Sequence, residues 1–302
     1  MKTLACLAWF AGAVALALAQ ANRDQSAPTQ GEWRLPGTES FVMRSPIVQR
    51  EYEIMVALPR GYAESDRKHP VLFVLDANGM FPVAVETARF LTFDRSMKEE
   101  PITVGIGYPV GRYRNTLPHR TRDFTPTPDP EWIVGLGQRH GFSPDGSGGA
   151  AAFLQFLAKE IIPLVEQRYR IDGRRRALHG YSMGGLFAFY ALFQQPGLFE
   201  SYLIGAPFLT WDKSAAWKFE QAFAATKQDL PARVFLSVGS LDHALVPVVE
   251  KLDALFRTRR YGKFVWQTQF FPEETHNSAI GLSLSRGLRW LYGDMLPPSA
   301  PP

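Results

Sequence analysis

Cysteine is almost absent from this chain of 302 residues. The single one, Cys6, stands in the apolar N-terminal segment, so the remainder can form no disulfide and offers no thiolate as nucleophile or metal ligand. The fold must therefore be held by a hydrophobic core, and a hydrophobic fraction of 46% is ordinary for a globular chain. Metal-ligand spacings, phosphate-binding loops and a complete dinucleotide fingerprint are also missing, since 105–107 (GIG) lacks the third glycine. We expect no cofactor and no metal.

A large excess of charge of one sign is missing as well. The chain has 33 basic and 29 acidic residues, a formal net charge of +4. This excess is too small to indicate binding of a nucleic acid, whose affinity depends on many phosphate contacts. It is compatible with a small anionic substrate. We expect a small-molecule partner and no nucleic acid.

Only one long apolar run is present, at residues 4–18. It is shorter than the roughly 20 residues of a membrane-spanning helix, follows Lys2, and precedes small residues at 17–19 and 19–21 that fit a signal-peptidase site. We predict a signal peptide at residues 1–21, and a protein exported across the inner membrane to the periplasm. The alternative is an uncleaved anchor, and only then is membrane contact expected.

The remaining chain is predicted to hold one domain, at residues 35–295. The flanking segments 22–34 and 296–302 are polar or rich in proline, and we predict a disordered linker and a disordered tail there.

Apolar or alternating runs predict eight strands, and helical stripes lie between the later ones. The strands are predicted at 41–44, 52–58, 71–75, 102–106, 177–181, 202–204, 234–238 and 264–271. The first two alternate like antiparallel edge strands, and the later ones are apolar throughout, like strands covered on both faces. Helical stripes are predicted within 153–164, 186–193, 248–256 and 280–291. The stretch 109–149 lacks clear periodicity, and we predict a long loop over the active site there.

A glycine-rich turn follows the fifth predicted strand. Ser182 lies between Gly180 and Gly184, and the helical stripe begins directly after it. A serine on such a strand-to-helix turn is a nucleophile elbow, where the hydroxyl is exposed beside the first N–H groups of the helix. A structural glycine turn is the alternative. An eight-stranded, mostly parallel sheet with helices on both faces and a nucleophile after the fifth strand is the α/β-hydrolase plan.

A serine nucleophile needs a base, and His276 follows the last predicted strand at the same sheet edge. His179 precedes the elbow and is expected to pack beneath it, while His243 lies one strand too early. The acid is predicted to be Asp242, after the strand at 234–238. Glu250, or a Ser182–His276 dyad without an acid, remain alternatives.

An oxyanion hole needs two N–H donors. One is expected to be the backbone N–H of Met183, directly after the serine. The second is expected from the turn after the strand at 71–75, where we choose Asn78.

The chain resembles the putative-esterase branch of the α/β hydrolases, most of all the periplasmic enterochelin/salmochelin-type siderophore esterases. The resemblance covers about residues 35–293, and its motifs lie at 70–78, 104–108, 120–127, 148–157, 179–185, 238–242, 275–278 and 285–292. It implies that Ser182, Asp242 and His276 are catalytic. It also implies substrate contacts for Arg120, Arg122 and Trp211, although Arg122 could instead pair with Asp123.

We therefore expect a serine carboxylic-ester hydrolase that acts through an acyl-enzyme. The substrate implied by the resemblance is a siderophore trilactone of the enterobactin or salmochelin type, such as an anionic ferric siderophore, or a similar bulky ester. Acyl transfer, or hydrolysis of acetyl or feruloyl groups on polysaccharides, would use the same triad. A non-catalytic binding protein on a hydrolase scaffold is the alternative of another class.

Overall fold

The computed structural model describes residues 34–293, so the predicted signal peptide, most of the linker and the whole of the predicted tail lie outside the described residues. From Gly37 onward the described residues form one compact unit built on an eight-stranded sheet. The strands are β1 (Thr38–Arg44), β2 (Glu51–Ala57), β3 (His69–Val74), β4 (Ile102–Gly107), β5 (Ile171–Tyr181), β6 (Ser201–Gly205), β7 (Asp229–Gly239) and β8 (Gly262–Phe271).

The strand order is β1-β2-β4-β3-β5-β6-β7-β8. β1 pairs with β2 and β2 with β4 in antiparallel fashion, and every other neighbouring pair is parallel. The predicted antiparallel edge and the mostly parallel sheet are thus confirmed. Because parallel strands end at the same edge, the segments after β3, β5, β6, β7 and β8 meet there.

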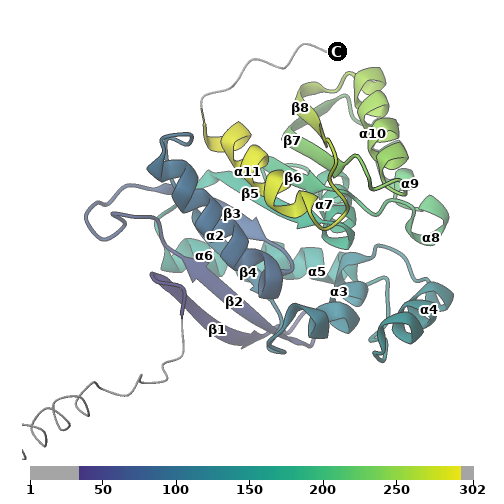
Figure 1. Ribbon diagram of the computed structural model, residues 1–302, viewed down its shortest axis with the longest axis horizontal. Coiled ribbons are helices and arrows are strands. Elements are labelled where there is room, and N and C mark those ends of the chain that lie inside the picture. The colour runs from purple at the N-terminus through teal and green to yellow at the C-terminus, as the bar shows by residue number, and fades with distance from the viewer. Residues whose placement is uncertain (1–33, 294–302) are drawn as a thin grey trace, which may run out of the picture. The chain divides into compact units, whose positions relative to one another are not determined.

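Helices cover both faces of the sheet (Figure 1). Successive strand residues point to opposite faces. Leu72 and Val74 pack with α2 (Ala77–Phe93) and α11 (Ala279–Tyr292), whereas Val71 and Phe73 belong to the core on the other face. That second core also contains residues of α5 (Ala150–Phe156), the π turn η2 (Leu157–Ile161), α6 (Ile162–Arg168), α7 (Met183–Gln194) and α10 (Val246–Arg259). This is the α/β-hydrolase fold.

The stretch 109–149, predicted as a long loop, is instead largely helical. It forms η1 (Tyr113–Thr116), α3 (Leu117–Phe124) and α4 (Pro130–His140). All three are short, and α3 and α4 have proline in the first turn, so they show no long apolar stripe in the sequence. Two more short helices, α8 (Trp211–Ser214) and α9 (Trp217–Ala224), follow β6.

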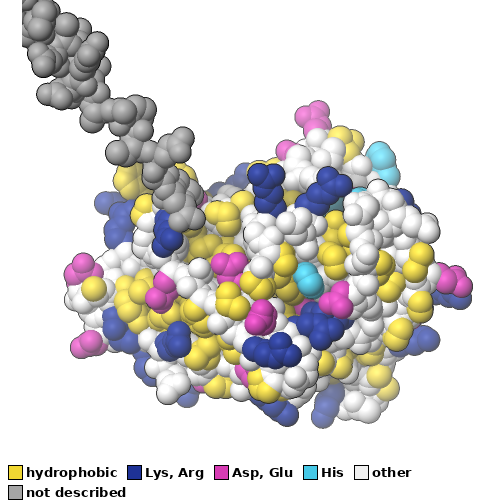
Figure 2. Space-filling model, turned by 90° about the horizontal axis from the view of Figure 1, so that it is seen from below, with side chains coloured by type: hydrophobic (Ala, Val, Ile, Leu, Met, Phe, Trp, Pro, Cys, Tyr) yellow, Lys and Arg dark blue, Asp and Glu magenta, His cyan; other side chains and the backbone are white. Residues whose placement is uncertain are grey.

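Charged side chains of both signs are mixed on the surface. On the face in Figure 2, Lys and Arg side chains alternate with acidic and hydrophobic ones. Within residues 34–293, no helix is long and apolar enough to cross a membrane.

Candidate active site

Ser182 stands at the sharp turn between β5 and α7. Its backbone has φ 59° and ψ −116°, a conformation that costs energy for any residue with a Cβ. Two hydrogen bonds hold the turn, from Ser182 N to Gly205 O (2.9 Å) and from Phe208 N to Ser182 O (3.1 Å). The Ser182 side chain makes no capping bond to α7, and the residue is partly exposed. The hydroxyl is therefore free to react with a substrate.

Two glycines allow the chain to pass this closely. A Cβ on Gly180 would lie 2.1 Å from Gly184 O, and one on Gly185 would lie 2.8 Å from Gly205 O. Both distances are far below a van der Waals contact between carbon and oxygen. The glycine pattern seen in the sequence is therefore a steric requirement of the turn.

The two expected oxyanion donors stand at the starts of two helices. Met183 is the first residue of α7, and α2 begins at Ala77, directly after β3. The first N–H groups of a helix have no partner within it; in α2, the N–H groups of Gly79 and Met80 are the first to find one, at Asp76 O (both 3.0 Å). The N–H groups of Ala77 and Asn78 precede these, so Asn78 is one of two candidates at this turn.

The side chain of Asn78 fixes the turn against the end of β4. Asn78 Nδ2 donates to Tyr108 O (2.8 Å) and to Gly111 O (3.0 Å), and Tyr108 N donates back to Asn78 Oδ1 (2.9 Å). The predicted role of the Asn78 backbone as an oxyanion donor remains a prediction. Its side chain has a separate, structural role, which is to hold the start of α2 against the segment that follows β4.

His276 and Asp242 are brought together by the ends of two neighbouring parallel strands. His276 Nδ1 lies 2.6 Å from Oδ2 of Asp242, which is 8% exposed. A carboxylate that accepts a hydrogen bond from Nδ1 keeps the proton on that nitrogen. Nε2 is then the nitrogen that can accept a proton from the serine. Glu250, the alternative acid, and His243, the alternative base, are both exposed. Of the acids weighed from the sequence, Asp242 is the one that contacts His276.

Tyr181, which the sequence did not single out, ties the histidine loop to the elbow. Its hydroxyl donates to His276 O (2.7 Å), and its ring lies 5.3 Å from the His276 ring. Burial, and then the Asp242 carboxylate, raise the pKa of Tyr181, so the hydroxyl stays protonated and donates. Among the described residues no hydrogen bond joins Ser182 Oγ to His276; such bonds commonly tighten only when substrate binds.

His179 lies beneath the elbow, as predicted. It is fully buried, and within the described chain neither ring nitrogen has a hydrogen-bond partner. Burial lowers the pKa of His179 to about 4, because the imidazolium ion would be desolvated there. His179 is therefore neutral at physiological pH.

Both arginines predicted to contact substrate are bound within the protein. Arg120, 5% exposed, donates from Nε and a terminal nitrogen to the two oxygens of Asp76 (2.7 and 2.9 Å). Arg122 donates to both oxygens of Asp123 (2.7 and 3.0 Å) and also to Asp145. The structural pairing of Arg122 with Asp123 is thus present. Substrate contact remains a prediction for both arginines.

Trp211, the third expected substrate contact, is buried. It is 1% exposed, and its indole N–H donates to Thr127 O (3.0 Å). Trp132 of α4 packs on it, with ring centroids 4.9 Å apart, and lies 5.4 Å from the ring of Phe208. α4 and α8 lie at the same end of the unit (Figure 1). Because Phe208 N binds Ser182 O, this aromatic group lies next to the elbow.

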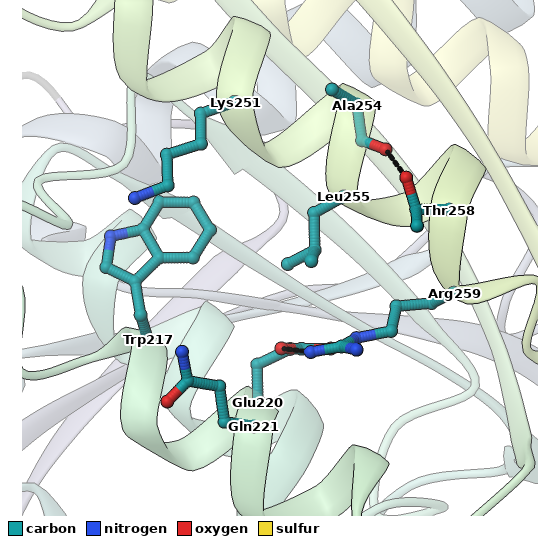
Figure 3. Close-up of a pocket in the computed structure, with 8 residues that line it drawn as sticks. All are labelled: Trp217, Glu220, Gln221, Lys251, Ala254, Leu255, Thr258 and Arg259. Carbon is teal, nitrogen blue, oxygen red and sulfur yellow. Dashed lines mark hydrogen bonds and ion pairs between the residues drawn. The ribbon is translucent and has the colours of Figure 1, made fainter.

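A separate pocket of about 290 Å³ lies between α9 and α10 (Figure 3). Lys251 Nζ lies 4.5 Å from the ring centroid of Trp217, and Glu220 accepts two hydrogen bonds from Arg259. Ser182, Asp242 and His276 are not among its lining residues. Within residues 34–293, no three or more His, Cys, Asp or Glu side chains are grouped to hold a metal ion.

Comparison with known proteins identifies the family. The model of the family described as "Putative esterase" matches residues 45–279. The chain belongs to this family. It is an esterase, and the ester-hydrolase activity expected from the sequence is confirmed at this level.

Several proteins that this chain resembles are named as siderophore esterases. The chain is 31% identical over 276 residues to the ferri-bacillibactin esterase BesA of Bacillus subtilis (strain 168), covering 87% of this chain and 92% of that protein. It is 29% identical over 271 residues to a siderophore enterobactin esterase of Emericella nidulans, covering 80% and 89%. Among solved structures, the BES protein from Bacillus cereus has a TM-score of 0.77 at 26% identity, covering 89% of this chain and 99% of that one.

Proposed function

We propose that this esterase hydrolyses siderophore esters by a serine mechanism with an acyl-enzyme intermediate. The observation that carries the mechanism is the 2.6 Å contact between His276 Nδ1 and Asp242 Oδ2, at the sheet edge where Ser182 is partly exposed. The substrate class rests on the named activities of its relatives, the ferri-bacillibactin esterase and the siderophore enterobactin esterase.

The first half of the reaction forms the acyl-enzyme. Ser182 Oγ attacks the ester carbonyl while His276 Nε2 takes the hydroxyl proton, and Asp242 stabilises the resulting imidazolium. The backbone N–H groups of Met183 and of Asn78 or Ala77 hold the oxyanion. When the tetrahedral intermediate collapses, the C–O bond to the alcohol breaks, and the alcohol leaves with the proton from His276.

The second half releases the acid. A water molecule gives a proton to His276 and attacks the acyl carbonyl, and the bond to Ser182 Oγ breaks as His276 returns that proton to the serine. Each cycle consumes one water and yields one alcohol and one acid.

The test is cleavage of a ferric catecholate trilactone, followed by mass spectrometry of the linear products. We expect Ser182→Ala to reduce turnover by about 10³- to 10⁶-fold, and the exposed Ser65→Ala to leave it unchanged. If short p-nitrophenyl esters are cleaved but no trilactone is, the siderophore proposal is wrong while the serine mechanism stands. Equal rates for wild type and Ser182→Ala would contradict the mechanism itself.

We further propose that residues 1–21 direct export to the periplasm, because a charged start, a short apolar run and a small-residue site follow one another there. Expression of the full chain in a Gram-negative host, with fractionation and N-terminal sequencing, tests this. A mature N-terminus near residue 20 or 22 in the periplasmic fraction is expected. An intact chain in the membrane fraction would indicate an anchor instead.

A further inference from the structure

We propose that Arg120 is a positioning residue that acts through Asp76. Their buried ion pair fixes the turn that carries one oxyanion donor, and it neutralises a carboxylate that lies beside both oxyanion donors. This inference rests on the proposed serine mechanism and assigns Arg120 a role other than substrate contact.

The pair is a closed, two-pronged contact away from solvent. Arg120 Nε lies 2.7 Å from Asp76 Oδ1, and its terminal nitrogen lies 2.9 Å from Oδ2. Asp76 is 1% exposed and Arg120 is 5% exposed. Paired N–H bonds of this kind fix the direction of both side chains.

Asp76 is the residue on which the geometry of the turn depends. It precedes α2 with φ 55° and ψ 37°, a left-handed conformation that is unfavourable for a residue with a Cβ. An aspartate before a helix usually caps it with its side chain, but Asp76 makes no such bond. Its carboxylate binds Arg120 instead. The ion pair thus stabilises the backbone conformation that begins α2 and directs the N–H groups of Ala77 and Asn78.

The same carboxylate also lies against the nucleophile elbow. A Cβ on Gly184, the second residue of α7, would lie 3.3 Å from Asp76 Oδ2. The carboxylate is therefore close to the starts of both helices whose N–H groups are proposed to hold the oxyanion. An unpaired negative charge there would oppose the charge that develops on the substrate. The guanidinium of Arg120 removes that opposition.

The surroundings of Arg120 keep it facing Asp76. It belongs to α3, which packs on α7, and its guanidinium carbon lies 5.6 Å from the ring centroid of Phe124 and 5.9 Å from that of Tyr113. The Tyr113 ring in turn covers the start of α2, since a Cβ on Gly79 would lie 3.2 Å from it. Two rings and a carboxylate thus hold the guanidinium in place.

The experiment compares a neutral ester, p-nitrophenyl acetate, with an anionic one, mono-p-nitrophenyl succinate. For Arg120→Met we expect kcat to fall about 10- to 100-fold on both esters with KM changed less than about threefold, because the oxyanion of the transition state is less well stabilised. The affinity for a boronic acid inhibitor, which mimics the tetrahedral intermediate, should fall by the same factor as kcat/KM. Arg257→Met, which removes an arginine that is 71% exposed and pairs with Asp253 on α10, is the control and should change nothing.

The double variant Asp76→Asn/Arg120→Met distinguishes the effect of an unpaired carboxylate at Asp76 from the effect of losing the contact that positions the turn. Because no unpaired carboxylate remains, it should recover about tenfold of the kcat lost in Arg120→Met. If Arg120→Met fails to fold, the double variant and Arg120→Lys carry the same comparison, with kcat lowered on both esters.

Two results would overturn the proposal. One is a rise in KM confined to the anionic ester with kcat on the acetate unchanged, which would make Arg120 a substrate-binding residue. The other is wild-type activity on both esters in every variant. If Ser182→Ala cleaves the esters as fast as the wild type, the serine mechanism fails, and that outcome is distinct from both.

Discussion

His276 Nδ1 and Asp242 Oδ2 lie 2.6 Å apart although 34 positions separate them in the chain. The contact exists because β7 and β8 are parallel neighbours, so that the segments after them meet at one edge of the sheet. A carboxylate in this position fixes the histidine tautomer and stabilises the imidazolium formed during the reaction.

Replacing Asp242 by asparagine should therefore lower kcat on p-nitrophenyl acetate by about 10²- to 10⁴-fold with little change in KM. Glu250→Gln, in the exposed alternative acid, should leave kcat within about twofold. Steady-state kinetics on the purified variants measure both. A full-rate Asp242→Asn enzyme would favour the Ser182–His276 dyad.

The sheet was predictable because its strands are short apolar runs between turns. Six of the eight predicted runs agree with the observed strands to within three residues at both ends. The two exceptions, β5 and β7, both begin earlier than predicted. The first half of β5 is polar, and Arg174, Arg175 and Arg176 there break the apolar pattern. β7 likewise begins earlier than its apolar core. α2 was missed, since Pro82 lies inside it and no stripe stands out.

The site was predictable only where the chain carries a local signature. The elbow, and the order of Ser182, Asp242 and His276, can be seen in the sequence. The partner of Arg120 cannot be seen in the sequence. Asp76 lies 44 positions away, and no sequence pattern indicates that its carboxylate is buried against Arg120. Tyr181 was also missed, since its hydrogen bond goes to a backbone carbonyl that any residue would supply.

Tyr181→Phe tests the link between elbow and histidine loop. Loss of the 2.7 Å bond to His276 O should cost about 1 kcal/mol of unfolding free energy and lower kcat several-fold, since the loop that carries His276 loosens. Chemical denaturation and steady-state kinetics provide the two readouts.

Tyr292→Phe is the matched control, because the Tyr292 hydroxyl is buried and has no hydrogen-bond partner among the described residues. Its removal should leave kcat unchanged and the stability within about 0.5 kcal/mol. An unaltered kcat in Tyr181→Phe would show that His276 is positioned by Asp242 alone.

Gly180→Ala tests the steric basis of the elbow. The added Cβ would lie 2.1 Å from Gly184 O, so the backbone must move. We expect a loss of about 2 kcal/mol or more in stability and of at least about 100-fold in kcat, because Ser182 and the Met183 N–H shift together.

Gly281→Ala places the same methyl group in open space on α11. It should raise the unfolding free energy by about 0.5–1 kcal/mol, since alanine favours a helix over glycine, and leave kcat unchanged. Thermal unfolding of both variants makes the comparison. A Gly180→Ala protein with wild-type activity would contradict the tight turn.

The buried His179 should make stability depend on pH. Its pKa is about 4 in the fold against 6.5 for the free side chain, so below pH 6.5 the unfolded chain binds a proton that the folded chain does not. The stabilisation is fully present above pH 6.5 and is lost as the pH falls toward 4. Between pH 7.5 and 5 this loss should amount to about 2 kcal/mol.

His179→Leu should remove that loss, while the exposed His243→Leu should keep it. Urea unfolding of wild type and both variants at pH 7.5 and 5 gives the differences, and carboxylates that titrate in the same range cancel because all three proteins share them. An equal loss in wild type and His179→Leu would mean that another group causes the acid sensitivity. A smaller loss in His179→Leu alone would establish that the imidazole beneath Ser182 is neutral in the working enzyme.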